Sequence, residues 1–267
     1  MRFFYDMYHV FRRDLKSYWR WKLHILFDTI VPIVDIALFL LVWSVIIGGG
    51  FEGVGMLNKD NYIAYLFSGF ILWNFVNTPF THDFVHSFIR EKHWKTIEYI
   101  FISPLKKFSL PYGISILPLL RSIYSTIILL IIGFLFFGFS IKGDFLSIVL
   151  IVLLTFLGFS GVGLMISALA SWREDFADVS WLINYILSIA SGVYFPLEAL
   201  PTNIKNFLML LPSTKAVYAV RAIILQGVGI MELLPTILGL IVFGIISIFL
   251  AILVYRFVER KVMLIGI

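Results

Sequence analysis

The sequence contains no cysteine at all. Disulfides, thiolate nucleophiles and zinc–thiolate sites are therefore excluded. Charged residues are also scarce, at 14%, whereas hydrophobic residues make up 60% of the 267 positions and the mean hydropathy is +0.97. A soluble domain of this length has too little interior to bury so much apolar surface. We therefore expect lipid to be the solvent for most of the chain.

Long apolar runs without interruption indicate helices rather than a β-barrel. Barrel strands alternate apolar and polar residues. This chain instead carries continuous runs such as Ser125–Phe139 and Leu146–Phe159. Because backbone polar groups in lipid must pair within the chain, such runs are expected to be transmembrane helices. The predicted fold class is an all-α polytopic membrane protein.

Six segments approach the length of about 20 apolar residues that a membrane crossing needs. They make residues 23–267 one predicted six-helix transmembrane domain. The predicted spans are Leu23–Ile47, Tyr62–Asp83, Leu110–Phe139, Phe145–Ser171, Phe176–Phe195 and Leu233–Phe257.

Basic residues indicate the orientation of these spans. Most of the 21 Lys and Arg residues lie before the first span, between the second and third, after the fourth and after the last. Positively charged loops stay in the cytoplasm, so both termini are expected there. The net charge of +5 then reflects topology, and we expect no nucleic-acid partner. The aromatic and charged N-terminus does not resemble a cleavable signal peptide.

Residues 1–22 precede the first span and are predicted to form an amphipathic helix on the cytoplasmic membrane surface. Aromatic and aliphatic residues recur there at helical spacing, among them Phe4, Tyr8 and Trp19, with Asp6 turned away from them. A simple aromatic and basic anchor without a mechanical role is the alternative.

A segment at about residues 196–232 is predicted to be a re-entrant or interfacial helical pair on the outer face. Two short apolar pieces, Ile204–Leu211 and Thr214–Leu225, are too short to cross a bilayer and too apolar for an open loop. Prolines precede or interrupt them, and an arginine lies in the second piece. These marker residues are Pro196, Pro201, Pro212 and Arg221.

Ionisable residues within predicted spans are rare and costly, so Asp28, Asp35 and Arg121 are candidate functional residues. Asp28 and Asp35 share one face of the first span, because seven residues make nearly two helical turns. Asp35 and Arg121 lie about equally far into spans that run in the same direction. We predict an Asp35–Arg121 ion pair that relieves both burial costs. A structural role is favoured over direct contact with substrate.

Small residues repeat every four positions in the fourth span, at Gly163, Ser167 and Ser171. This spacing lets helices approach closely, either within one subunit or across a dimer. His82 and His86 lie one helical turn apart, but no carboxylate or thiolate completes a ligand set, so no metal site is expected.

Two stretches resemble the ABC-2 type permease family. One runs from Arg90 to Pro104 and reads REKHWKTIEYIFISP, with Lys95 where the family usually has glycine. The other runs from Ser191 to Pro201, reads SGVYFPLEALP and continues to Leu211-Pro212-Ser213-Thr214 and Arg221. The six-span layout agrees with the family along nearly the whole chain.

The resemblance implies an exporter subunit in the inner membrane of a prokaryote. Two copies of it, a homodimer, would work with two cytosolic ATP-binding-cassette ATPase subunits that hold ATP and Mg²⁺. This chain would bind no cofactor itself and has no catalytic residue. The sequence contains no phosphate-binding loop of the G-x-x-x-x-G-K-[ST] type, so a partner must bind ATP.

The loop at about residues 90–107 is the implied coupling element to the ATPase. A short amphipathic helix there would dock in a groove of the partner. The coupling residues would be Glu91, Lys95, Thr96, Ile97, Glu98 and Tyr99.

An exporter of lipid, drug or lipid-linked glycan is the function that this resemblance favours. The alternative is an ion- or proton-coupled carrier that uses Asp28, Asp35 and Arg121. Such carriers usually contain internal repeats with broken helices, and no internal repeat is visible. An intramembrane enzyme is disfavoured, because no matched nucleophile and base are present.

Overall fold

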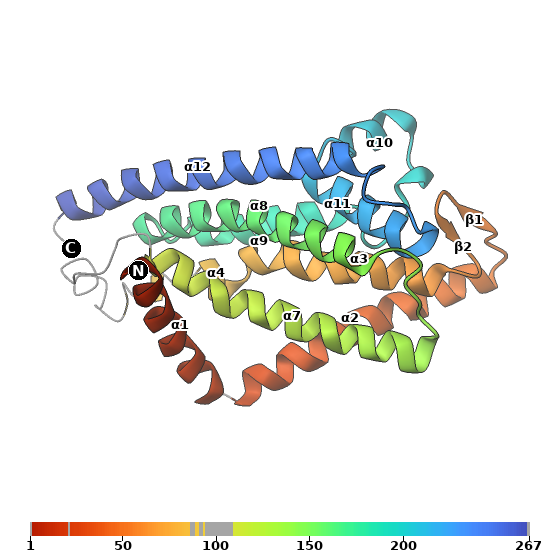
Figure 1. Ribbon diagram of the computed structural model, residues 1–267, viewed down its shortest axis with the longest axis horizontal. Coiled ribbons are helices and arrows are strands. Elements are labelled where there is room, and N and C mark those ends of the chain that lie inside the picture. Colours follow the sequence, from red (N-terminus) through yellow and green to blue (C-terminus); the bar gives the residue numbers. More distant parts are fainter. Residues whose placement is uncertain (1, 21, 86–88, 91–92, 94–108, 266–267) are drawn as a thin grey trace.

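The computed structural model describes residues 2–20, 22–85, 89–90, 93 and 109–265, and these are mainly helical, as predicted (Figure 1). Four long helices run along the molecule: α2 (Lys22–Gly48), α7 (Ser109–Phe137), α8 (Phe145–Trp172) and α12 (Leu234–Ile265). Each is long and apolar enough to cross a membrane. Their bounds agree closely with four of the six predicted spans, except that α12 continues beyond Phe257.

The six-span count itself is not confirmed. Within the described residues, four helices qualify as spans by length and composition, or five if one bent pair is counted as a span. The longest helix in the predicted second span is α3 (Tyr62–Asn77), with 16 residues, and in the predicted fifth it is α9 (Phe176–Ala190), with 15 residues. Both are shorter than the roughly 20 residues of a full crossing.

Local backbone chemistry shortens these two helices. After α3 the chain tightens into the 3-10 turn η1 (Thr78–Phe80) around Pro79, and Thr81 is extended before the short helix α4 (His82–Val85). After α9, Gly192 adopts a φ of 69°, a left-handed conformation that glycine tolerates and that ends a helix. Apolar composition alone does not reveal such endings.

Helix α3 forms the centre of the bundle. It packs against α2, α7 and α8, and against α11 (Pro212–Arg221). Leu66, Phe67, Leu72 and Val76 are fully buried in the main hydrophobic cluster. Because this helix is apolar all round, its burial on every side is the expected outcome.

The small residues of α8 pack within the subunit. A side chain at Gly163 would place its Cβ 2.4 Å from the carbonyl oxygen of Pro79. Ser167 Oγ donates a hydrogen bond to the Val85 carbonyl at 2.9 Å. Gly158 and Gly161 occupy the opposite side of the helix and meet α12. Close packing of α8 on η1, α4 and α12 therefore explains the repeat.

Helix α1 (Arg2–Arg20) exists as predicted, and Asp6 is turned away from the exposed aromatic residues, whereas its position on a membrane surface stays a prediction. Asp6 and Asp14 are buried, and Phe4 and Trp19 are about two-thirds exposed. The helix packs along the beginning of α7 (Figure 1). Carboxylates therefore point towards protein, and aromatic side chains point outward.

The segment at residues 196–232 folds into two helices bent by 98°, α10 (Thr202–Leu208) and α11 (Pro212–Arg221), with a π-turn over Ala222–Gln226. A 3-10 turn, η2 (Leu197–Ala199), follows Pro196. Pro201 is the N-cap of α10.

The two helices of this pair differ in burial. α11 has many buried residues, whereas α10 has none, so only α11 packs into the bundle, and the re-entrant or interfacial position of the pair stays a prediction. A two-stranded hairpin, β1 (Gly53–Val54) and β2 (Leu57–Asn58), precedes α3 near the same end of the molecule (Figure 1).

Replacing Gly163 with Ala is expected to lower the unfolding midpoint in detergent by the equivalent of about 1–3 kcal/mol, because the new methyl overlaps Pro79. Gly239→Ala in α12 is the matched control, since a Cβ there meets nothing within 4 Å. Equal midpoints for the two variants would show that this contact does not limit packing.

Candidate functional site

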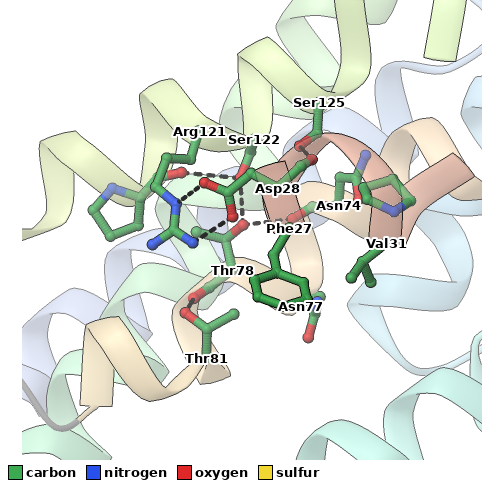
Figure 2. Close-up of a pocket in the computed structure, with 12 residues that line it drawn as sticks. Phe27, Asp28, Val31, Asn74, Asn77, Thr78, Thr81, Arg121, Ser122 and Ser125 are labelled. Atoms are coloured by element: carbon green, nitrogen blue, oxygen red, sulfur yellow. Dashed lines mark hydrogen bonds and ion pairs between the residues drawn. The ribbon is translucent and has the colours of Figure 1, made fainter. Parts of the chain in front are cut away.

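A polar pocket lies between α2, the end of α3 with η1, and α7 (Figure 2). Its volume is about 250 Å³. Each of the two longer walls supplies a polar stripe at helical spacing. From α3 to α4 the stripe is Asn74, Asn77, Thr78 and Thr81, and from α7 it is Pro118, Arg121, Ser122 and Ser125.

Asp28 and Arg121 form an ion pair in this pocket. Arg121 donates from Nε to Asp28 Oδ2 at 2.6 Å and from Nη2 to Oδ1 at 2.5 Å. Their side chains are 13% and 23% exposed, so both charges are largely removed from solvent. Two parallel charge-assisted bonds fix the planar guanidinium against the carboxylate. α2 and α7 are thereby joined at one depth.

Tyr18 connects α1 to this pair. Its hydroxyl donates to Asp28 Oδ2 at 2.6 Å, and the Arg121 guanidinium lies 5.3 Å from the centre of its ring. Burial, and then the hydrogen bond that the Asp28 carboxylate accepts, raise the pKa of Tyr18 above its ordinary value. The phenol is therefore a hydrogen-bond donor throughout the physiological pH range. Three helices meet at one carboxylate.

The predicted Asp35–Arg121 pair is wrong, because Arg121 binds Asp28. The prediction assumed that α2 and α7 start at the same depth. Instead α1 packs along the start of α7, and α2 begins farther along the bundle (Figure 1). Asp28, which lies seven residues or about 10 Å before Asp35, is consequently level with Arg121. Asp35 is exposed on α2 and does not line the pocket.

Uncharged polar groups complete the pocket. The hydroxyls of Thr78 and Ser122 hydrogen-bond to each other across α3 and α7. Asn77 Oδ1 accepts from Asn184 Nδ2 of α9 at 2.7 Å. These residues were not predicted from the sequence. The signal available was the spacing i, i+3, i+4, i+7 of polar residues inside two apolar segments.

Arg221 is buried in a second polar cluster, in the outer segment. It is 2% exposed and donates at 2.8 Å to the Tyr65 hydroxyl and to the carbonyls of Gly192 and Val193. Its guanidinium also lies 3.6 Å from the centre of the Tyr65 ring. These carbonyls follow the end of α9, where no helical N–H is available to them. Arg221 therefore stabilises the junction between α9, α11 and α3.

The three prolines among the marker residues of this segment lie at the starts of helices. Pro196 precedes η2, Pro201 is the N-cap of α10, and Pro212 is at the first turn of α11. Proline is favoured at such positions, because its fixed φ suits the first turn and no amide hydrogen is needed there.

The predicted coupling residues Glu91, Lys95, Thr96, Ile97, Glu98 and Tyr99 lie outside the described residues. Two polar contacts connect described residues of this part of the chain, Arg90 and His93, to other elements. Arg90 Nη2 lies 3.6 Å from Asp14 Oδ1 of α1, and His93 Nε2 lies 3.1 Å from Glu174 Oε1 in the turn after α8.

Membrane-length helices around a polar pocket with a shielded ion pair are typical of membrane transport proteins. The family model for the ABC-2 type transporter matches residues 5–225. The chain belongs to this family. It is accordingly a multi-pass membrane protein of the kind that forms the membrane subunit of an ABC transporter, and the carrier alternative is not favoured.

Similar proteins carry related names. ABC transporter G family member 20 of Dictyostelium discoideum is 33% identical over 147 residues, which are 54% of this chain but 20% of that protein. Inner membrane transport permease YadH of Escherichia coli is 23% identical over 200 residues, 73% of this chain and 76% of that protein. For permease YhhJ of the same species the values are 24% over 160 residues, 58% and 42%.

Asp28→Asn or Arg121→Gln alone is expected to lower the unfolding free energy by about 2–4 kcal/mol, because each leaves its partner's charge shielded and unpaired. The exchange of Asp28→Arg with Arg121→Asp should recover part of that loss. Thermal unfolding in detergent measures both. Asp35→Asn on the same helix is the control and should leave the midpoint unchanged or raise it. Additive single defects with no recovery would contradict the pairing.

Arg221→Lys is expected to lower the unfolding free energy by about 2–4 kcal/mol, since an ammonium cannot reproduce the fork of bonds to Tyr65, Gly192 and Val193. The control is Arg173→Lys, where the arginine side chain is 63% exposed and the expected change is within about 0.5 kcal/mol. Similar midpoints for both variants, measured by thermal unfolding, would show that the Arg221 bonds add no stability.

Proposed function

We propose that this chain is the permease subunit of an ATP-binding-cassette exporter that moves an amphiphilic substrate out of the cytoplasm. Membership of the ABC-2 type transporter family is the observation that carries the proposal. The pocket adds chemical support, because it combines hydrogen-bonding groups with the exposed apolar side chains of Phe27 and Val31 at one edge. A molecule with a polar head and an apolar tail matches such a boundary.

The working complex contains two copies of this chain and two cytosolic ATPase subunits, with ATP and Mg²⁺ held by the ATPases. Both termini lie in the cytoplasm of this assembly, and the membrane is the inner membrane of a prokaryote. The distribution of basic residues supports this orientation. The coupling element is the segment at residues 90–107, with Glu91, Lys95, Thr96, Ile97, Glu98 and Tyr99 at the ATPase surface.

Movement of this coupling segment reaches the pocket through α1. The Arg90–Asp14 ion pair connects the segment's start to α1, and Tyr18, one helical turn after Asp14, holds Asp28. When ATP binding closes the ATPases, the segment moves and this last part of α1 moves with it. Two contacts one turn apart on a rigid helix move together and so transmit such displacements. The Asp28–Arg121 pair and the adjoining pocket are then repositioned.

Glu98→Lys is expected to reduce the ATPase activity stimulated by the permease about tenfold, because a reversed charge at a docked helix disfavours the contact. The measurement uses the permease and its co-purified cassette ATPase in vesicles. Lys59→Glu, on the exposed turn before α3, is the control with the opposite change of charge, and should leave this activity unchanged.

Two results would contradict the proposal. One is stimulated ATPase activity that survives both Glu98→Lys and Tyr99→Ala. The other is movement of a fluorescent phospholipid across vesicles that contain this chain alone, without nucleotide.

A further inference from the structure

We infer that the pocket between α2, α3 and α7 binds the headgroup of the transported amphiphile, and that this headgroup is uncharged and rich in hydroxyl groups. The inference rests on the proposed function and adds the site and the chemical class of the substrate. Its basis is the combination of a neutralised ion pair, unsatisfied amide groups and an apolar edge in one cavity (Figure 2).

The charge balance of the pocket disfavours an ionic headgroup. Asp28 and Arg121 are the charged residues that line it, and they bind each other through two short bonds. An anionic phosphate could reach only the remaining N–H groups of Arg121, where the neighbouring Asp28 carboxylate repels it, or would displace Asp28 and leave that carboxylate unpaired in a poorly solvated place. An ammonium group would meet the reverse problem at Arg121. An uncharged headgroup avoids both costs.

Amide groups in the pocket supply hydrogen-bonding capacity for hydroxyls. Asn77 uses its oxygen for Asn184, and within the part of the chain that the structure describes its amide nitrogen has no acceptor. Asn74 makes only a long contact of 3.5 Å from Nδ2 to Thr126, which leaves its carbonyl oxygen available. Such amides both donate and accept, as do hydroxyl groups. A polyol or sugar ring presents matching donors and acceptors.

The size and edge of the pocket fit a headgroup whose chains remain outside. Its volume of about 250 Å³ is smaller than the volume of pockets that enclose whole drug-sized molecules, which is about 300–1,000 Å³. Phe27 and Val31 line it, yet are 57% and 48% exposed, so it reaches the apolar surface of the bundle there. Acyl chains can lie along these side chains while the polar part enters.

The depth of the pocket suits a lipid of the inner leaflet. Asp28 lies six residues, or about 9 Å, along α2 from its first residue, Lys22. In the orientation proposed above, this is just below the cytoplasmic headgroup layer. A substrate could therefore enter sideways from that leaflet without its headgroup first crossing the apolar centre.

The natural absence of cysteine provides a direct test. Thr81→Cys places one thiol in the pocket, and the chain then carries no other. The variant is reconstituted without any ATPase in phosphatidylcholine vesicles, with or without monoglucosyl diacylglycerol, and its modification by N-ethylmaleimide is timed. Ser125→Cys gives the same measurement if Thr81→Cys does not fold. Lys59→Cys, on the exposed turn before α3, is the control for general lipid effects.

The glycolipid is expected to slow modification of the pocket thiol about fivefold and to leave the control thiol unchanged. Adding Asn74→Leu should remove most of this protection, because a lost hydrogen bond weakens binding about fivefold. The matched Asn203→Leu, on exposed α10, should not. Equal protection by phosphatidic acid would overturn the uncharged class, and no protection by the glycolipid would overturn the site.

A second arm separates a transported molecule from a resident lipid. With the ATPase subunits present, added ATP should reduce protection, because the glycolipid is moved out of the inner leaflet. Protection that persists during ATP hydrolysis would overturn the transport role of the pocket. Since the first arm needs no ATPase, failure of the pocket inference and failure of the proposed export function give different results.

Discussion

The Asp28–Arg121 ion pair is the interaction on which the arrangement of α1, α2 and α7 depends. A single charge in an apolar environment is costly, so each side chain constrains where the other must lie. The pair fixes α2 against α7, and Tyr18 adds α1 to the same carboxylate. The polar stripes of α3 and α7 then face each other beside it, and a pocket results. One electrostatic requirement thus places four elements.

Helix positions could be read from the sequence where apolar length alone decides them. α8 was predicted to within one residue, because Asp144 and Arg173 bound a continuous apolar run and Asp144 caps the helix through Ser147. The ends of α3 and α9 could not be read in this way. They depend on Pro79 in a 3-10 turn and on the positive φ of Gly192, which are features of local backbone geometry.

The site was only partly predictable for a similar reason. Asp28 and Arg121 were recognised from the cost of charge in lipid. The partner of Arg121 was wrongly predicted to be Asp35, because counting residues from the helix starts does not show that α2 begins farther along the bundle than α7. The stripes around Asn74 and Ser122 were readable from their spacing and were overlooked. The separation of Asp6 from the aromatic residues of α1 was readable from their spacing, but the burial of Asp6 and Asp14 against protein is a result of tertiary packing that the spacing does not reveal.

The inward carboxylates of α1 have a mechanical consequence. If this helix peeled away into lipid, Asp6 and Asp14 would lose their protein surroundings and meet hydrocarbon, which strongly opposes separation. Helix α1 therefore stays attached to the bundle and does not move independently on the membrane surface. Its aromatic outer side can slide against headgroups while its acidic inner side keeps it attached to the bundle. A push delivered at Asp14 has to be carried by the transmembrane helices themselves.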